Sequence, residues 1–425
     1  MKTLVQTLFF LLLVMQICYP QVNWIKYEYN PVLSGNYGGY AWNNHLLTPC
    51  VIFNDELNQF EMWFSTGGAG RIGFAYSNDG ISWTMHPDPV LEPSEGTWDS
   101  LAVSDPFVIR ENGQYKMWYS SRNWNIQIFK IGYATSPDGI NWTKYTANPI
   151  FEAGTNPYES GGVYGCCVMP VTGGYKMWYT VYDTSTTHES ICYATSLDGI
   201  LWQKDTLNNP VLEYGEPGEW DEEGIWFPRV LYLNNLYYMW YGGECNLING
   251  TLWQLGLATS SDGINWIKSE SNPVLSDVPD SLNPGAIQSG SVILVGDTLH
   301  MWYDENPPNP FAGKIFESIY LANSYFEATS VDIPNAYPTD YVLIQNYPNP
   351  FNPSTKISWQ SPVGSWQTLK IYDVLGNEIK TLVNEYKPSG EYEIEFDAAN
   401  FPSGVYFYQL KAGSLIETKK MILLR

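Results

Sequence analysis

The stretch SPDGINW at residues 136–142 recurs along the chain and decides its fold. Related copies are SNDGISW at 77–83, SLDGILW at 196–202 and SSDGINW at 260–266. An Asp-Gly pair between two β-rich runs is a strong signal for a tight hairpin turn. Each copy therefore predicts one β-hairpin.

A Met-Trp-aromatic strand occurs five times, at Met62, Met117, Met177, Met239 and Met301. The intervals between these methionines are 55, 60, 62 and 62 residues, so the repeating unit is about 60 residues long. The second unit shows four β-like runs: DPFVIR, YKMWYS, KIGYATS and NWTKYTANPIF. Because no helical periodicity separates such runs, the repeats predict an all-β fold with a five-bladed β-propeller over residues 24–326.

The fifth unit lacks its last strand, and the N-terminal region supplies a match. WIKYEYNPVL at 24–33 corresponds to WTKYTANPIF at 142–151 position by position. We expect this N-terminal strand to complete the last blade, which removes a free sheet edge.

The overall composition excludes several classes of protein. The chain has 44 Asp and Glu against 21 Lys and Arg, a formal charge of -23, which disfavours nucleic-acid and anionic-membrane partners. With 44% hydrophobic residues, 18 Trp and 32 Tyr, the chain can bury a large core and is not disordered. We expect a monomer without nucleic-acid partners.

The N-terminus predicts export. Residues 1–20 combine Lys2 with the apolar run LFFLLLVMQI, which is typical of a signal peptide and too short for a membrane span. Cys18 lacks the small residue that precedes a lipid-anchored cysteine. The other five cysteines are few and odd in number, so we expect buried free thiols, with one disulfide as the alternative. No CxxC pair occurs, and we expect no cofactor and no zinc site, while a calcium ion in the channel stays an open alternative.

After a linker at 327–337, residues 338–425 predict a small Ig-like β-sandwich of alternating strands and Gly, Pro and Asn turns. The motifs YPNPFNPSTKI at 347–357, IYDVLGNEIKTLV at 371–383 and SGVYFYQL at 403–410 resemble the C-terminal sorting domain of type IX secretion cargo. The resemblance implies interaction with that secretion machinery and export across the outer membrane, to the medium or the cell surface.

Strands alternate in direction within a blade, so the loops divide between two faces. The face with the Asp-Gly turns (the DG face) is nearly identical in every blade, so Asp79, Asp138, Asp198 and Asp262 are expected to form turns. The opposite face carries the blade-to-blade crossovers and the loops between second and third strands. This variable face differs between blades, and we expect the site there.

Two kinds of polar residue stand out on the variable face. Asp99, Glu159 and Asp221 repeat at one position, which favours structural hydrogen bonding, although they also qualify as sugar-binding groups. Asp105 breaks the symmetry, since the equivalent residues are Gly165, Phe227 and Ser289. Arg229 is conspicuous because arginine is rare in this chain.

The repeats SPDGINWTKYTANPIF and YKMWYS resemble the propeller glycoside hydrolases of families 32, 43, 62 and 130. The resemblance implies that Asp105, in the SDP motif at 104–106, is a catalytic carboxylate. WNNH at 42–45 has Asn where the first family carboxylate is expected, and Gly165 and Cys166 replace the third.

Glycoside cleavage needs one carboxylic acid and one carboxylate, so we predict Glu222 or Glu223 as the partner of Asp105. The predicted substrate-binding residues are Trp42, His45, Asp99, Arg122, Trp124, Glu159, Tyr164, Asp221, Trp226, Arg229 and Glu244.

Two functions remain open from the sequence. One is a secreted glycoside hydrolase that acts on plant or microbial polysaccharide or oligosaccharide. The other is a non-catalytic carbohydrate-binding or adhesion propeller, while a protein-interaction role has no support in the sequence.

Overall fold

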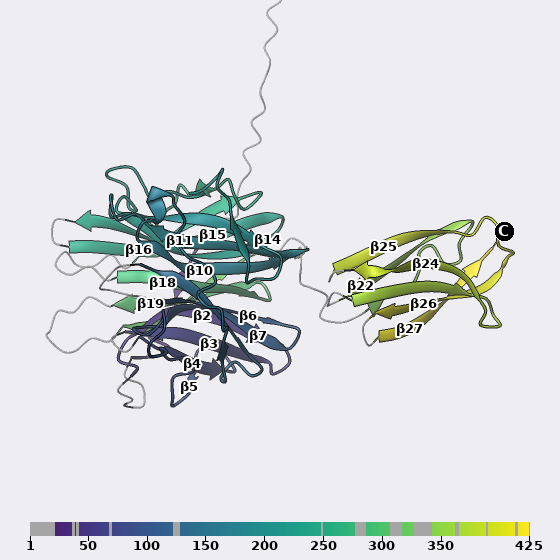
Figure 1. Ribbon diagram of the computed structural model, residues 1–425, viewed down its shortest axis with the longest axis horizontal. Helices are drawn as coiled ribbons and strands as arrows, with labels where there is room; N and C mark the ends of the chain where they lie inside the picture. The colour runs from purple at the N-terminus through teal and green to yellow at the C-terminus, as the bar shows by residue number, and fades with distance from the viewer. Residues whose placement is uncertain are drawn as a thin grey trace, which may run out of the picture.

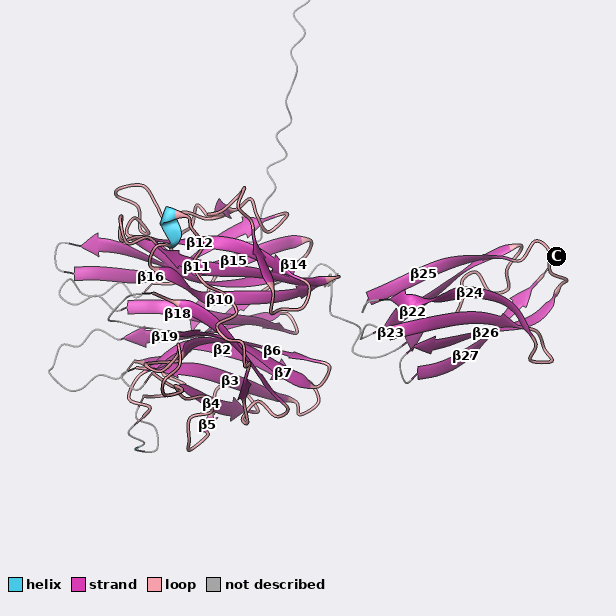
Figure 2. Cartoon of the chain, in the orientation of Figure 1, coloured by secondary structure: helices cyan, strands magenta, loops and turns pink. Residues whose placement is uncertain are grey.

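The computed structural model describes residues 22–35, 39, 42–67, 70–121, 128–247, 250–276, 286–306, 317–326, 342–361, 365–387, 390–412 and 415–424. The described chain is dominated by β-strands, and Figure 2 shows one short helical turn, Pro157–Glu159. In these ranges there is no helix with the length and hydrophobicity that a membrane crossing requires.

The five predicted blades are confirmed, and Figure 1 shows how their strands pack on one another. Blade 1 contains β2 (Leu46–Asn54), β3 (Gln59–Thr66), β4 (Ile72–Ser77) and β5 (Thr84–Met85). Blade 2 contains β6 (Ser104–Glu111), β7 (Gln114–Ser121), β8 (Lys130–Ser136) and β9 (Thr143–Lys144). Blade 3 contains β10 (Gly162–Val171), β11 (Gly174–Tyr182), β12 (Glu189–Ser196) and β13 (Trp202–Lys204). Consecutive strands pair antiparallel within each blade.

Blades 4 and 5 are joined by one parallel pair, Trp253 with Ala286. Blade 4 contains β14 (Gly224–Leu233), β15 (Leu236–Leu247), β16 (Gly250–Ser260) and β17 (Ile267–Lys268). Blade 5 contains β18 (Ala286–Val295), β19 (Thr298–Asn306), β20 (Ser318–Tyr325) and, from the other end of the propeller sequence, β1 (Ile25–Lys26). Ile25 pairs with Asn323 and Lys26 with Ala322, so the ring closes through β1.

The recurring tryptophans join neighbouring blades on the DG face. The indole N–H of Trp63 in blade 1 donates to the carbonyl of Gly139 in the Asp-Gly turn of blade 2, at 2.8 Å. The same contact joins Trp118 to Gly199 at 2.9 Å and Trp178 to Gly263 at 2.7 Å. Packing between blades therefore accounts for much of the aromatic content.

The Asp-Gly turns are held by their own aspartates. Asp138 accepts hydrogen bonds from the backbone N–H groups of Ile140 and Asn141 at 3.0 and 2.7 Å. Although burial opposes it, this hydrogen bonding lowers the pKa of Asp138 to about 2. The turn glycine, Gly139, has φ +76°, a conformation that favours glycine.

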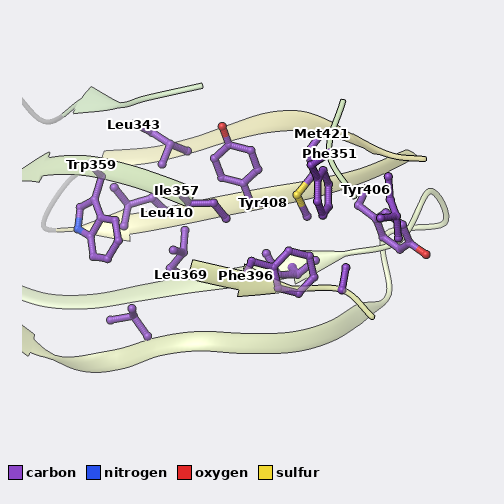
Figure 3. Close-up of a cluster of buried hydrophobic side chains, with 14 of the residues drawn as sticks. Leu343, Phe351, Ile357, Trp359, Leu369, Phe396, Tyr406, Tyr408, Leu410 and Met421 are labelled. Carbon is purple, nitrogen blue, oxygen red and sulfur yellow. The ribbon is translucent and has the colours of Figure 1, made fainter. Parts of the chain in front are cut away.

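The C-terminal part of the chain forms two further sheets. One contains β21 (Val342–Leu343), β22 (Ser354–Ser361) and β25 (Gly390–Asp397). The other contains β23 (Ser365–Tyr372), β24 (Glu378–Lys387), β26 (Gly404–Ala412) and β27 (Leu415–Leu423). Figure 3 shows the apolar side chains between them, including Ile357, Leu369 and Leu410, which are fully buried.

Candidate functional site

A bulge interrupts the first strand of every blade near the variable face. The pairing shifts between Ser104 and Phe107 in β6 and between Trp226 and Arg229 in β14, with equivalent shifts in β2, β10 and β18. A bulge re-aims the side chains of its strand, and bulges are common beside active sites.

The leading bulge residues of blades 1 to 4 share an unusual backbone conformation. Thr48, Asp105, Gly165 and Phe227 have φ values of +46°, +50°, +54° and +50°. Such values are rare for residues other than glycine.

The bulges of blades 2, 3 and 4 are fixed by hydroxyl groups of the preceding blade. The Asp105 N–H donates to the Ser65 hydroxyl at 2.7 Å, and the Phe227 N–H donates to the Thr180 hydroxyl at 3.0 Å. In blade 4 the residue equivalent to Ser65 and Thr180 is Gly242, which has no hydroxyl group. The bulge residue of blade 5, Ser289, is instead hydrogen-bonded within its own blade. Its N–H and hydroxyl both donate to the Asp304 carboxylate at 2.8 Å.

A cavity of about 260 Å³ opens where these bulges converge. Thr48, Asp105, Phe227 and Gln288 reach it from blades 1, 2, 4 and 5. The other lining residues are Leu47, Ser65, Thr66, Gly67, Gly70, Leu101, Ala102 and Ser104. Asp105 is the one carboxylate among these lining residues, and it accepts a hydrogen bond from the Ser104 hydroxyl at 3.1 Å.

Phe107 and Arg229 lie two residues further along β6 and β14 than Asp105 and Phe227. The Arg229 guanidinium lies 5.5 Å from the Phe107 ring centroid, so these two side chains meet across the channel. Arg229 is buried and donates to the carbonyl oxygens of Cys166 and Pro228 at 3.3 and 3.1 Å. Arg229 is a predicted substrate-binding residue, but it does not line the cavity.

The three repeated carboxylates are buried inside the blades. Asp99 forms an ion pair with Lys144 at 2.6 Å and accepts a hydrogen bond from Tyr119 at 3.0 Å. The same Lys and Tyr contacts hold Glu159 in blade 3 and Asp221 in blade 4. None of the three lines the cavity, so this geometry favours the structural interpretation over sugar binding.

Glu222 and Glu223, the predicted partners of Asp105, lie outside the cavity lining. Glu222 accepts a hydrogen bond from the Gly218 N–H at 2.5 Å, within its own crossover loop. Glu223 accepts from the Asn246 amide at 2.5 Å and lies 3.8 Å from His188.

Glu244 lies beside Glu223 in blade 4. The Glu223 N–H donates to the backbone carbonyl of Glu244 at 3.0 Å. Burial raises the pKa of the Glu244 carboxyl, and the Glu223 carboxylate adds to the rise. Blade 4 thus presents two adjacent carboxylates on the variable face, apart from the cavity.

The other predicted binding residues are dispersed. The Trp42 indole donates to the Pro87 carbonyl at 3.0 Å, and that of Trp226 donates to the Gln288 carbonyl at 2.9 Å. His45 lies 3.4 Å from Glu317, and a side chain on Gly67, which lines the cavity, would collide with it. Tyr164 packs edge-on against Phe227. Arg122 and Trp124 lie outside the described residues.

Three residues line the cavity that were not among the predicted site residues: Thr48, Phe227 and Gln288. Thr48 and Phe227 occupy the repeat position of Asp105, and Gln288 directly precedes the residue at that position in blade 5. Aligning the five blades on Asp105 therefore points to all three residues. In the described part of the chain, no group of three or more His, Cys, Asp and Glu side chains is arranged to hold a metal ion. The cysteines Cys50, Cys166, Cys167, Cys192 and Cys245 are free and buried.

Solved structures reproduce the propeller. A thermostable family-43 glycoside hydrolase superposes with a TM-score of 0.53 at 20% identity, covering 66% of this chain and 90% of that one. A member of the GH130 family, whose mannoside phosphorylases include hydrolases of β-1,2 mannosidic linkages in Candida mannan, has a TM-score of 0.55 at 17% identity. That superposition covers 71% of this chain and 93% of the other. The propeller therefore shares the five-bladed fold of these two structures.

Sequence comparisons agree for both parts of the chain. Residues 50–128 match the family model of beta-1,4-mannooligosaccharide phosphorylase, and residues 345–424 match the secretion system C-terminal sorting domain. Both resemblances drawn from the sequence are therefore confirmed, and the sorting-domain model covers nearly all of the C-terminal sandwich.

Two curated relatives match part of this chain. An uncharacterized protein of Mycobacterium tuberculosis is 29% identical over 181 residues, 41% of this chain and 56% of its own length. The 1,2-beta-oligomannan phosphorylase of Thermoanaerobacter sp. (strain X514) is 27% identical over 210 residues, 48% of this chain and 64% of its own length. The chain thus spans less than two thirds of either relative.

Proposed function

We propose that the propeller is a secreted carbohydrate-active enzyme that cleaves glycosidic bonds of mannosides at the Asp105 cavity. The observation that carries the proposal is Asp105 itself. Its carboxylate lines a cavity on the channel axis, while the equivalent residues of blades 1, 3, 4 and 5 carry no carboxyl group. The substrate class is proposed because the matching family model and the Thermoanaerobacter relative both carry names of mannose-oligomer phosphorylases.

Cleavage at this cavity could be hydrolysis or phosphorolysis, and the two reactions differ in the group that acts together with Asp105. Hydrolysis needs a second carboxyl group, and Glu223 is the better candidate because Glu222 is held within its crossover loop. Phosphorolysis needs only one protein carboxyl group, because phosphate replaces water as the nucleophile. The cavity lining, with Asp105 as its one carboxylate, favours phosphorolysis.

Purified protein incubated with β-1,2- and β-1,4-mannobiose, with and without phosphate, tests the proposal. We expect Asp105→Asn to abolish turnover while leaving the fold intact. Turnover that requires phosphate and survives Glu223→Gln supports phosphorolysis, whereas turnover without phosphate that is lost in Glu223→Gln supports hydrolysis. Full activity of Asp105→Asn would overturn the site.

A non-catalytic carbohydrate-binding propeller is the second candidate. It is favoured by the separation of Glu223 from the cavity that Asp105 lines. Binding of mannan, xylan, arabinan or fructan without turnover on any of them would support it. Under either function, the sorting domain leads us to propose export through the type IX machinery, to the medium or the cell surface.

A further inference from the structure

Backbone strain in the propeller is concentrated at one cavity. Eight described residues other than glycine have a positive φ, and four of them are asparagines, which tolerate this conformation well. Of the other four, Thr48, Asp105 and Phe227 line the same cavity. Left-handed backbone is unfavourable for a residue with a Cβ, and such strain clusters at functional sites.

Phe227 is the unexpected member of this set. A bulky aromatic residue is poorly suited to φ +50°, yet its ring is buried and lines the cavity. The bulge places this phenyl group in the cavity that also receives the Asp105 carboxylate from blade 2.

Gly165 of blade 3 makes room for this arrangement. A Cβ added to Gly165 would lie 2.4 Å from Cδ1 of Phe227, so the phenyl ring occupies the space that a side chain would fill. Tyr164 packs edge-on against the same ring at 5.6 Å between centroids. Phe227 is therefore held against blade 3.

We propose that Phe227 forms the apolar binding wall for the sugar ring on which Asp105 acts, and that Gly165 is required to hold it there. A pyranose ring has an apolar C–H face and a polar hydroxyl edge, which match a phenyl group and a carboxylate in one cavity. The volume, about 260 Å³, is below the ~300–1,000 Å³ of pockets for drug-sized ligands and suits one sugar ring. This inference rests on the proposed function and adds how the sugar is recognised.

Three variants test the role of Phe227, with β-1,2- and β-1,4-mannobiose as probes in calorimetric titrations and initial-rate measurements. We expect Phe227→Leu to weaken binding and raise KM about tenfold or more, because it removes aromatic contact area. Phe227→Tyr keeps the ring and should stay close to the wild type. Gly165→Ala should behave like Phe227→Leu, since its Cβ collides with the ring.

Phe129→Leu is the matched control. Phe129 belongs to the same aromatic cluster and packs on Tyr164, but it does not line the cavity. Wild-type affinity in Phe227→Leu, or an equal loss in Phe129→Leu, would overturn the inference. If the wild-type protein neither binds nor cleaves either mannobiose, the proposed function fails and the inference fails with it. Binding without turnover that Phe227→Leu weakens would support the inference and remove only the catalytic claim.

Discussion

The indole N–H of Trp302 in blade 5 donates a hydrogen bond of 2.8 Å to the carbonyl oxygen of Gly80 in blade 1. This contact joins the last blade to the first across the closure of the ring. Residues 286–326 of blade 5 contain no Asp-Gly pair. The indole N–H of Trp240 in blade 4 has no hydrogen-bond partner among the described residues. The repeat therefore provides a matched pair of buried tryptophans, one hydrogen-bonded and one not.

We predict that Trp302→Phe lowers the free energy of unfolding by about 1 kcal/mol more than Trp240→Phe. Both substitutions remove the same ring volume, but only the first removes a hydrogen bond between blades. Chemical denaturation followed by fluorescence measures the difference. Equal losses would show that this bond adds no net stability.

The ion pair between Lys144 and Asp99 is expected to stabilise blade 2 strongly. Lys144→Met leaves the Asp99 carboxylate, whose side chain is 1% exposed, without its cation, which should cost about 3–5 kcal/mol. Lys130→Met in the same blade is the control. It removes an exposed pair with Glu152 and should cost below about 1 kcal/mol. Equilibrium unfolding of both variants tests this, and similar costs would contradict it.

The same pair predicts a pH dependence of stability. Burial raises the pKa of Asp99, but hydrogen bonds from Lys144 and Thr97 outweigh it and hold the pKa below its usual value. The folded pKa is thus lower than the unfolded one, so this stabilisation is present above about pH 4 and is lost as the pH falls further. Lys144→Met should show a smaller stability loss than the wild type between pH 6 and pH 3 in denaturation curves.

Asp304 should have the opposite pH dependence. Burial raises its pKa to about 7, and the nearby Glu317 contributes, although the Ser289 hydrogen bonds oppose the rise. Since the folded pKa lies above the unfolded value, stability should fall as the pH rises from about 4 to about 7. Asp304→Asn should remove this fall, while the exposed Asp88→Asn should retain it. Thermal unfolding of the wild type and both variants at pH 5 and pH 8 measures this difference. The same change in stability with pH in all three proteins would contradict the raised pKa of Asp304.

Tyr408 is expected to be critical for the sorting domain. Its buried hydroxyl donates to the Ile344 carbonyl and accepts from the Asn346 N–H, both at 2.8 Å. Tyr408→Phe leaves both groups without this partner and should cost about 1–3 kcal/mol. We expect lower thermal stability of this domain and less exported protein, compared with the exposed control Tyr347→Phe. Unchanged unfolding would contradict the role given to the hydroxyl.

The site could be predicted from the sequence only in part. Asp105 stands out in the sequence because it breaks the symmetry of the repeat. Glu222 and Glu223 were chosen for charge and approximate position, but their loops hold them away from the cavity lining. Phe227 lines the cavity but does not stand out in the sequence, because phenylalanine in an apolar strand normally indicates core packing and its left-handed backbone leaves no mark in the sequence.

The sequence by itself determined the number of blades, the Asp-Gly turns and the sorting domain, because these depend on local patterns that repeat or that match a family along the chain. The use of tryptophan for packing between blades followed from the same patterns. Only the tertiary structure decided which residues share the cavity. Thr48, Asp105, Phe227 and Gln288 are far apart in the sequence, and they meet because bulges in four different strands turn toward one axis.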